Sequence, residues 1–203
     1  MKTKLLGLVA ACALLGSTVA ANASPYVVTL EEVGANVVAT GSGDIVTTGL
    51  GSNGVANVVP QLIPDVGAVF TGLPSSTPQA EFYTAALSGP ASFGPGSQTF
   101  AATGTGAMVV LFDAVSEIAV PIGYSSDTLL SDTAIYDTAT FASLGVTPGT
   151  YVWTWGTGAD QSFTLEIGTT PLPAALPLFA TGLGALGLLG WRRKRKAAAI
   201  AAA

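Results

Sequence analysis

Residues 150–167 read TYVWTWGTGADQSFTLEI and predict the clearest element of the chain, a β-hairpin. The first arm places three aromatic side chains on one strand face: Tyr151, Trp153 and Trp155. The return arm does the same with three apolar side chains: Phe163, Leu165 and Ile167. The Gly-rich stretch between the arms predicts their turn, and the Pro148-Gly149 pair upstream predicts a type II turn at the entrance.

The chain before this hairpin carries the same kind of signal in shorter pieces. Short β-branched runs predict strands over residues 26–30, 36–40, 45–48, 55–59, 66–71, 107–112 and 117–122. Residues 82–87 predict a single helical turn, and residues 88–99 predict a loop that divides the sheet into halves. Many short strands between turn residues are typical of a sandwich or a barrel. We therefore expect a mainly β fold, an antiparallel β-sandwich-like domain over residues 24–169.

The charged residues are separated along the chain. The seven basic residues lie near the N-terminus and in residues 192–196, whereas the twelve acidic residues lie between Glu31 and Glu166. Residues 24–170 therefore contain no Lys, Arg or His and carry a formal charge of −12, one for each acidic residue. This composition excludes nucleic-acid binding, which needs clustered cations, and catalysis by His, Lys or a thiolate. We expect a protein that is not an enzyme and has no cofactor.

The aromatic face of the hairpin has two interpretations. Rings on one strand face are typical of a hydrophobic core, because aromatic side chains bury a large apolar area. Rings on an exposed face instead offer a platform for a sugar ring, which makes Tyr151, Trp153 and Trp155 a candidate glycan-binding site. Core packing is the expected outcome, and the solvent exposure of the three rings decides between the two.

Three aspartates follow one another at intervals of five residues, namely Asp127, Asp132 and Asp137, with Asp113 and Glu117 upstream. Without His or Cys nearby, such carboxylates suit only Ca²⁺ among the common metals. The sequence has no Asp-x-Asp-x-Asp-Gly loop, so we expect solvated acidic turns and no metal site. Nothing in the sequence singles out two of the carboxylates as a glycoside-hydrolysing pair.

Residues 1–23 have the three parts of a secretory signal peptide. Two lysines precede a short apolar core, and Ala21 and Ala23 match the small-residue cleavage site. We expect signal peptidase to cut after Ala23, so that the mature chain begins at Ser24. One alternative stays open, because the run Val-Ala-Ala-Cys ending at Cys12 resembles a lipobox, which would make a lipidated cysteine the first residue.

Residues 172–191 are uncharged and long enough to cross a bilayer, because twenty helical residues rise about 30 Å. A basic cluster follows, consisting of Arg192, Arg193, Lys194, Arg195 and Lys196. By the positive-inside rule this cluster stays in the cytoplasm and the acidic domain faces outward. A plain single-pass anchor explains these features. Three prolines indicate a protease recognition site in addition to an anchor: Pro171, Pro173 and Pro177. They keep the entrance to the span extended, as a protease that reads an extended peptide requires.

The sequence TPLPAALPLF, a Gly-Leu-rich span and the basic cluster together resemble the PEP-CTERM sorting signal, in its Val-Pro-Leu-Pro-Ala variant. The resemblance covers residues 170–196 with its three parts in order, and Thr170 stands where the variant usually has Val. It implies a recognition motif formed by Pro171, Leu172, Pro173 and Ala174, and a retention role for the basic cluster. The implied partner is an exosortase, a membrane-embedded cysteine transpeptidase of Gram-negative bacteria that make exopolysaccharide.

These features predict a signal helix at residues 1–23, a secreted domain at 24–169, a sorting signal at 170–196 with a transmembrane helix over about 174–191, and an Ala-rich tail at 197–203. We expect the precursor to lie transiently in the inner membrane with its domain in the periplasm. The mature form is expected at the cell surface or outside the cell, as a non-enzymatic extracellular-matrix protein of an exopolysaccharide biofilm. The alternative is a carbohydrate-binding module that uses the aromatic face of the hairpin.

Overall fold

Two β-sheets dominate the computed structural model, which describes residues 24–77, 79–158 and 160–168. The sheets have six and seven strands, and most neighbouring strands run antiparallel. The prediction of a mainly β fold is therefore confirmed. The predicted signal helix, sorting motif, transmembrane helix and basic cluster lie outside the described residues.

The first sheet has the strand order β12-β13-β1-β2-β11-β8. Its strands are β1 (Tyr26–Val33), β2 (Asn36–Gly43), β8 (Thr103–Gly106), β11 (Leu130–Tyr136), β12 (Gly149–Thr154) and β13 (Ser162–Ile167). The second sheet has the order β3-β6-β10-β9-β5-β4-β7. Its strands are β3 (Gly51–Ala56), β4 (Gln61–Ile63), β5 (Ala68–Thr71), β6 (Ala80–Thr84), β7 (Thr99–Phe100), β9 (Val109–Phe112) and β10 (Glu117–Pro121). The short helices are η1 (Pro64–Val66), η2 (Asp113–Val115) and α1 (Phe141–Leu144).

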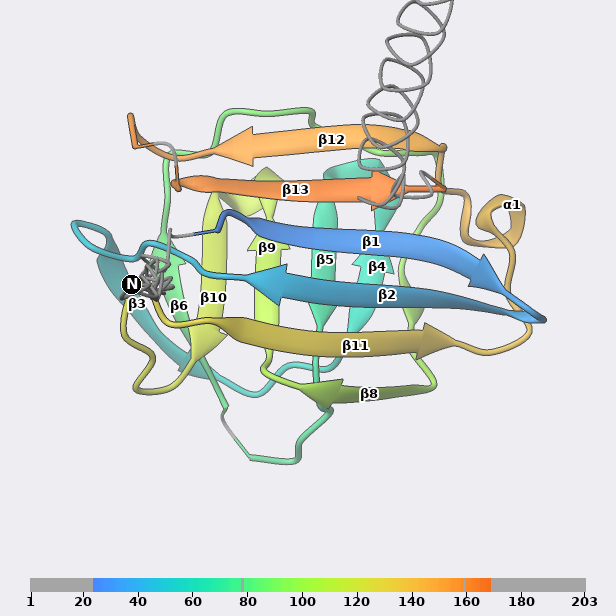
Figure 1. Cartoon of the computed structure of the whole chain (residues 1–203), viewed down its shortest axis with the longest axis horizontal. Coiled ribbons are helices and arrows are strands. Elements are labelled where there is room, and N and C mark those ends of the chain that lie inside the picture. Colours follow the sequence, from blue (N-terminus) through green and yellow to red (C-terminus); the bar gives the residue numbers. More distant parts are fainter. Residues whose placement is uncertain (1–23, 78, 159, 169–203) are drawn as a thin grey trace, which may run out of the picture.

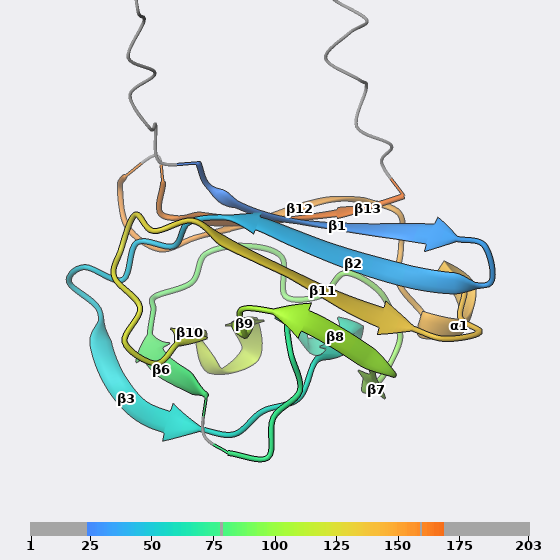
Figure 2. The ribbon, with the colours of Figure 1, turned by 60° about the horizontal axis from the view of Figure 1, so that its bottom comes forward.

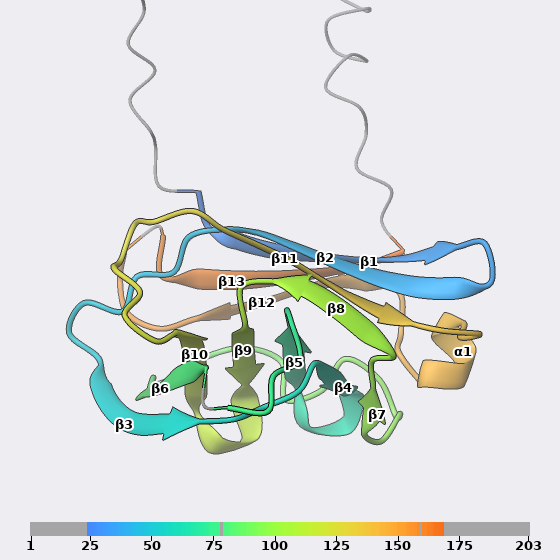
Figure 3. The ribbon, with the colours of Figure 1, turned by 90° about the horizontal axis from the view of Figure 1, so that it is seen from below.

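The two sheets lie face to face as two layers (Figures 2 and 3), and the strands of the first sheet run across those of the second (Figure 1). Both layers contribute to one core, which includes Leu30 and Trp153 from the first sheet and Val69 and Ile118 from the second. Alternate residues of β1, β2, β11 and β13 are buried, because every second side chain of a strand points into the space between the layers.

The first and last strands, β1 and β13, pair in parallel, whereas the other ladders between described strands are antiparallel. Tyr26 lies beside Phe163 in this pairing, and Leu30 lies beside Ile167. The backbone N–H of Gly168 then donates to the carbonyl oxygen of Leu30 at 2.9 Å. The expectation of antiparallel pairing is therefore wrong for this pair. Both terminal strands lie inside the sheet, between β12 and β2.

The predicted hairpin is confirmed as β12 and β13, whose antiparallel pairing sets Tyr151 opposite Leu165. The predicted type II turn at its entrance is wrong. Gly149 has a φ of 156°, far from the roughly +80° that the third position of such a turn requires, and it already belongs to β12. The chain reverses instead through α1, whose capping box begins at Thr140 and whose C-cap Gly145 has a left-handed φ of 64°.

Several other predictions are corrected by the structure. Residues 45–48 lie outside the strands, and residues 82–84 belong to strand β6 rather than to a helical turn. The run 55–59 is a strand only at its start, and the run 66–71 only from Ala68. No run predicts β4, β7, β8 or β11. The first three are short, and β11 carries Asp132 at an inward position, where the sequence pattern of a strand expects an apolar residue.

Aromatic rings fill the core beside β1. The ring of Phe163 contacts Trp153 edge-on at a centroid distance of 6.1 Å and lies 5.4 Å from the ring of Tyr26. Phe93 comes from the predicted loop at residues 88–99, and it packs edge-on against Trp153 with only 1 % of its surface exposed. This loop therefore covers one side of the core and does not divide a sheet into halves.

The second sheet is buried on both faces near its centre. Val69 and Leu111 belong to the main core, whereas Phe70 and Val110 belong to a second apolar cluster on the opposite face. Burial on both faces explains why β5 and β9 read as almost continuous apolar runs instead of alternating ones.

Truncating Phe163 to alanine should destabilise the fold strongly, because its ring is fully buried between Tyr26 and Trp153. Such a change in a core costs about 3–5 kcal/mol of unfolding free energy. The control is Val152→Ala on the outward face of β12, where the side chain is 44 % exposed and the loss should stay below about 0.5 kcal/mol. Urea unfolding of the mature protein measures both variants. Equal losses would contradict the assigned core.

Candidate functional site

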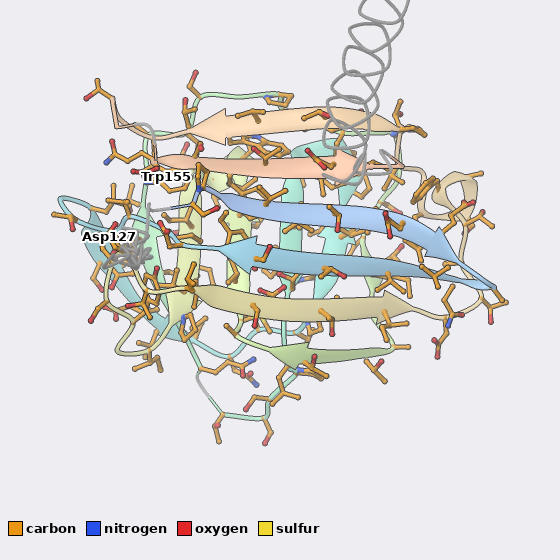
Figure 4. The ribbon with its side chains drawn as sticks, in the orientation of Figure 1. Asp127 and Trp155 are labelled. Atoms are coloured by element: carbon orange, nitrogen blue, oxygen red, sulfur yellow. The ribbon has the colours of Figure 1, made fainter. Side chains whose placement is uncertain are left out.

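The aromatic face of the hairpin lies inside the protein. Trp153 is 0 % exposed and Trp155 is 2 % exposed, while Tyr151 is half-buried. The indole N–H of Trp153 donates to the carbonyl oxygen of Pro90 at 2.9 Å, and that of Trp155 donates to the carbonyl oxygen of Val46 at 2.9 Å. Figure 4 labels Trp155 at one end of the first sheet. These rings pack as core, so they do not form the exposed platform on which a sugar would stack.

A buried hydrogen bond joins two strands of the first sheet that are not neighbours. The phenol O–H of Tyr26 in β1 donates to Oδ2 of Asp132 in β11. The bond passes over β2, which lies between these strands, and over Gly41 in particular. A Cβ at Gly41 would collide with both the Tyr26 hydroxyl and the Asp132 carboxylate. The sheet therefore requires a glycine at this position.

Burial raises the pKa of Asp132 to about 6, although the hydroxyls of Tyr26 and Thr71 favour its charged form. Thr71 belongs to β5, so this hydroxyl approaches from the second sheet, and it makes no hydrogen bond of ordinary geometry among the described residues. Burial, followed by the charge of Asp132, raises the pKa of Tyr26 as well. Because residues 24–168 contain no Lys, Arg or His, the groups that favour the charged form of Asp132 here are hydroxyls rather than cations.

The three regularly spaced aspartates do not form one site. Asp127 (Figure 4) and Asp137 are exposed, as turn residues should be, but Asp132 is only 3 % exposed. The prediction of a solvated turn is therefore wrong for Asp132, which lies at an inward position of β11. Among the described residues, no group of three or more carboxylates is placed to hold a metal ion.

A second buried carboxylate, Asp44, lies beside the start of β1. The backbone N–H of Ser24 donates to its Oδ2 at 2.7 Å, and the backbone N–H of Asp44 donates to the carbonyl oxygen of Ser24 at 2.9 Å. Asp44 is 1 % exposed, and its other oxygen, Oδ1, has no hydrogen-bond partner among the described residues. The adjacent Ile45 N–H donates to the hydroxyl of Tyr124 at 3.0 Å. The sequence pattern did not mark Asp44, because a short loop after a strand carries no sign of such a contact.

Negative charge gathers around Asp44. Burial raises its pKa, the Ser24 N–H opposes the rise, and the charges of Asp127 and Asp160 add to it. Asp127 lies in the loop before β11, and Asp160 lies in the loop between β12 and β13. Three different loops thus bring carboxylates to the same end of the first sheet, in a region of sequence that has no basic side chain.

The predicted sorting motif, the basic cluster and the signal cleavage residues Ala21 and Ala23 lie outside the described residues, so their roles stay predictions. No helix in the described part of the chain is long and apolar enough to cross a membrane. Comparisons with known proteins found no matching family, no matching curated protein and no matching solved structure.

Replacing Asp132 by asparagine should change how stability depends on pH. The folded-state pKa of about 6 lies above the ordinary value of 3.8, so the folded state holds this proton more tightly than the unfolded state does. The contribution of Asp132 to stability therefore falls as pH rises from about 4 to about 6, by on the order of 2–3 kcal/mol, and stays low above that range. Asp132→Asn keeps the shape of the side chain and an acceptor for Tyr26, but it does not titrate.

Urea unfolding of the mature protein between about pH 4.5 and 7.5 tests this expectation. The wild type should lose stability across the range, and Asp132→Asn should lose clearly less. Some dependence should remain, because burial also raises the pKa of Asp113. Asp137→Asn, an exposed change just beyond β11, should follow the wild type. An unchanged pH profile in Asp132→Asn would contradict the burial of this carboxylate.

Proposed function

We propose that this chain is a secreted protein processed by an exosortase, and that its mature domain is a non-enzymatic component of the surface or extracellular matrix of a Gram-negative bacterium. The C-terminal sequence carries this proposal. There a Pro-Leu-Pro-Ala motif, an uncharged span and five basic residues follow one another in the order of a sorting signal. The signal peptide sequence at the other end supplies the export that such processing requires.

The position of the last described strand supports this interpretation of the tail. Strand β13 ends at Ile167, and Gly168 still donates a hydrogen bond to Leu30 in β1. The sorting motif begins at Thr170. Cleavage in or after the motif would therefore leave every described strand in place, as the release of a folded domain requires.

The outward face of the first sheet supports a structural role. It is rich in hydroxyl side chains, including Thr40, Thr105, Thr133 and Thr164. The hydroxyls of Thr105 and Thr133 form a cross-strand hydrogen bond at 2.8 Å. Such a surface suits contact with water and with a hydrated polysaccharide, which presents many hydroxyl groups of its own. The two carboxylates buried in the described fold are engaged in hydrogen bonds within it.

In this proposal the precursor crosses the inner membrane under its signal peptide, and signal peptidase removes residues 1–23. The basic cluster at residues 192–196 holds the tail in the membrane with the acidic domain in the periplasm. An exosortase then cuts at the motif and passes the domain to the cell surface or to the exopolysaccharide matrix.

Replacing Pro173 by alanine should block processing while membrane insertion stays normal. Residues 174–191 still provide about eighteen uncharged residues, and the basic cluster still sets their orientation. The variant should accumulate as a membrane-bound precursor that keeps a tag placed after Ala203, whereas the wild type should lose that tag. Pro177→Ala is the comparison variant. It removes a proline of the extended entrance that lies outside the recognition motif, so it separates loss of the motif from loss of extension. Membrane fractionation and intact mass in a strain with the exosortase measure the outcome.

Neutralising residues 192–196 should act differently, by weakening the stop signal so that unprocessed chains leave the membrane. The two changes therefore separate recognition from retention. Normal tag loss and localisation of the Pro173→Ala variant would reduce the tail to an ordinary membrane anchor and overturn the proposed sorting.

A further inference from the structure

The chain holds Ser24 in a fixed position against Asp44. The carbonyl oxygen of Ser24 accepts a hydrogen bond from the Asp44 N–H at 2.9 Å, and Pro25 forms a parallel β-bridge with Asp44. Gly43 makes this approach possible, because a Cβ there would collide with the carbonyl oxygens of Ser24 and Pro25. The nitrogen of Ser24 is thereby held 2.7 Å from Oδ2 of Asp44.

This nitrogen is the atom that signal peptidase would release. We propose that cleavage of the Ala23–Ser24 bond completes the fold, because the new α-ammonium group of Ser24 forms an ion pair with the buried carboxylate of Asp44. The inference rests on the signal peptidase step of the proposed function, and it adds a structural role for that step.

The chemistry of the step is a hydrolysis. Water adds across the peptide bond, its hydroxyl goes to the carbonyl carbon of Ala23, and its hydrogen goes to the nitrogen of Ser24. The freed amine takes up a proton at neutral pH, because the ordinary pKa of an α-amino group is about 7.7–8.0. A neutral amide with one N–H thus becomes a cation with three.

The surroundings of Asp44 match a cation better than an amide. Its Oδ2 accepts the one N–H that Ser24 has in the uncleaved chain, while its Oδ1 is buried without a partner among the described residues. An ammonium group carries two further N–H donors at the same place. Since Asp44 is 1 % exposed, water competes little with these contacts.

The charge balance favours the same pairing. The mature domain has no basic side chain between Ser24 and Thr170, so its α-ammonium is the cation available to Asp44. Asp127 and Asp160 act on Asp44 from their own loops, and the hydroxyl of Tyr124 is held next to it by the Ile45 N–H. A positive charge placed here relieves the repulsion among these three carboxylates, which no basic side chain of residues 24–168 offsets.

The test measures the pKa of the α-amine in the purified mature protein. Trace acetylation with acetic anhydride over a series of pH values reports the free amine, and a glutamate-specific protease releases the N-terminal peptide, which ends at Glu31. Residues 24–170 contain no lysine, so the α-amine is the amine of this domain, and peptide mapping separates it from Lys194 and Lys196 if the tail is retained. We expect a pKa about 1–3 units above the ordinary 7.7–8.0, because an adjacent carboxylate favours the charged amine.

Asp44→Asn removes the charge while keeping an acceptor for the Ser24 nitrogen, and it should return the amine to its ordinary pKa. Asp137→Asn is the matched control, an exposed carboxylate beyond β11, and it should leave the raised pKa unchanged. Asp127→Asn should lower the pKa by a smaller amount than Asp44→Asn does. If Asp44→Asn fails to fold, the pKa values of the α-amine in the wild type and in Asp127→Asn decide whether the ion pair forms.

The mass of the N-terminal peptide separates the two ways in which the inference fails. A chain that begins at a lipidated Cys12, or that keeps residues 1–23, would overturn both this inference and the signal peptidase step of the proposed function. A chain that begins at Ser24 but has an ordinary amine pKa in the wild type would overturn the ion pair and leave the proposed function standing.

Discussion

The hydrogen bond from Tyr26 to Asp132 is the constraint on which the first sheet depends. It joins β1 to β11 across β2, and it requires Gly41 beneath it because any side chain there would occupy the space of the polar pair. A slip of one residue in β1 or β11 would turn one partner toward solvent, so the bond also specifies the register of these strands. The Thr71 hydroxyl approaches the same pair from the second sheet, which ties the polar group to both layers.

Residues 24–168 contain no basic side chain, so no cation from this part of the chain stabilises the buried carboxylates. A buried carboxylate is unfavourable unless donors satisfy it, and here the donors are the Tyr26 hydroxyl for Asp132 and the Ser24 backbone for Asp44. The pKa of each acid is nevertheless raised by burial, which shows that these donors do not fully replace water. Residues 24–168 offer Asp132 no cation, whereas processing of the precursor would supply one to Asp44.

The parallel pairing of β1 with β13 fits a domain that is cut at both ends. Both strands lie inside the sheet, and Gly168, directly after β13, donates to Leu30. Removal of sequence before Ser24 and after Thr170 would therefore expose no strand of the described fold. In the proposed pathway the domain keeps its core through both cleavages, and the first cleavage strengthens the contact at the start of β1.

The sequence by itself determined the hairpin of β12 and β13, because alternate residues of a strand face opposite sides whatever surrounds them. It also determined the mainly β class and the lack of basic side chains in residues 24–168. Only the tertiary structure decided that Asp132 lies in a strand and in the core, since the hydroxyl that satisfies it belongs to Tyr26, 106 residues earlier. The contact between Ser24 and Asp44 and the parallel pairing of the terminal strands were decided in the same way. Such partners meet only when the chain has folded, so local patterns of residues do not predict these contacts.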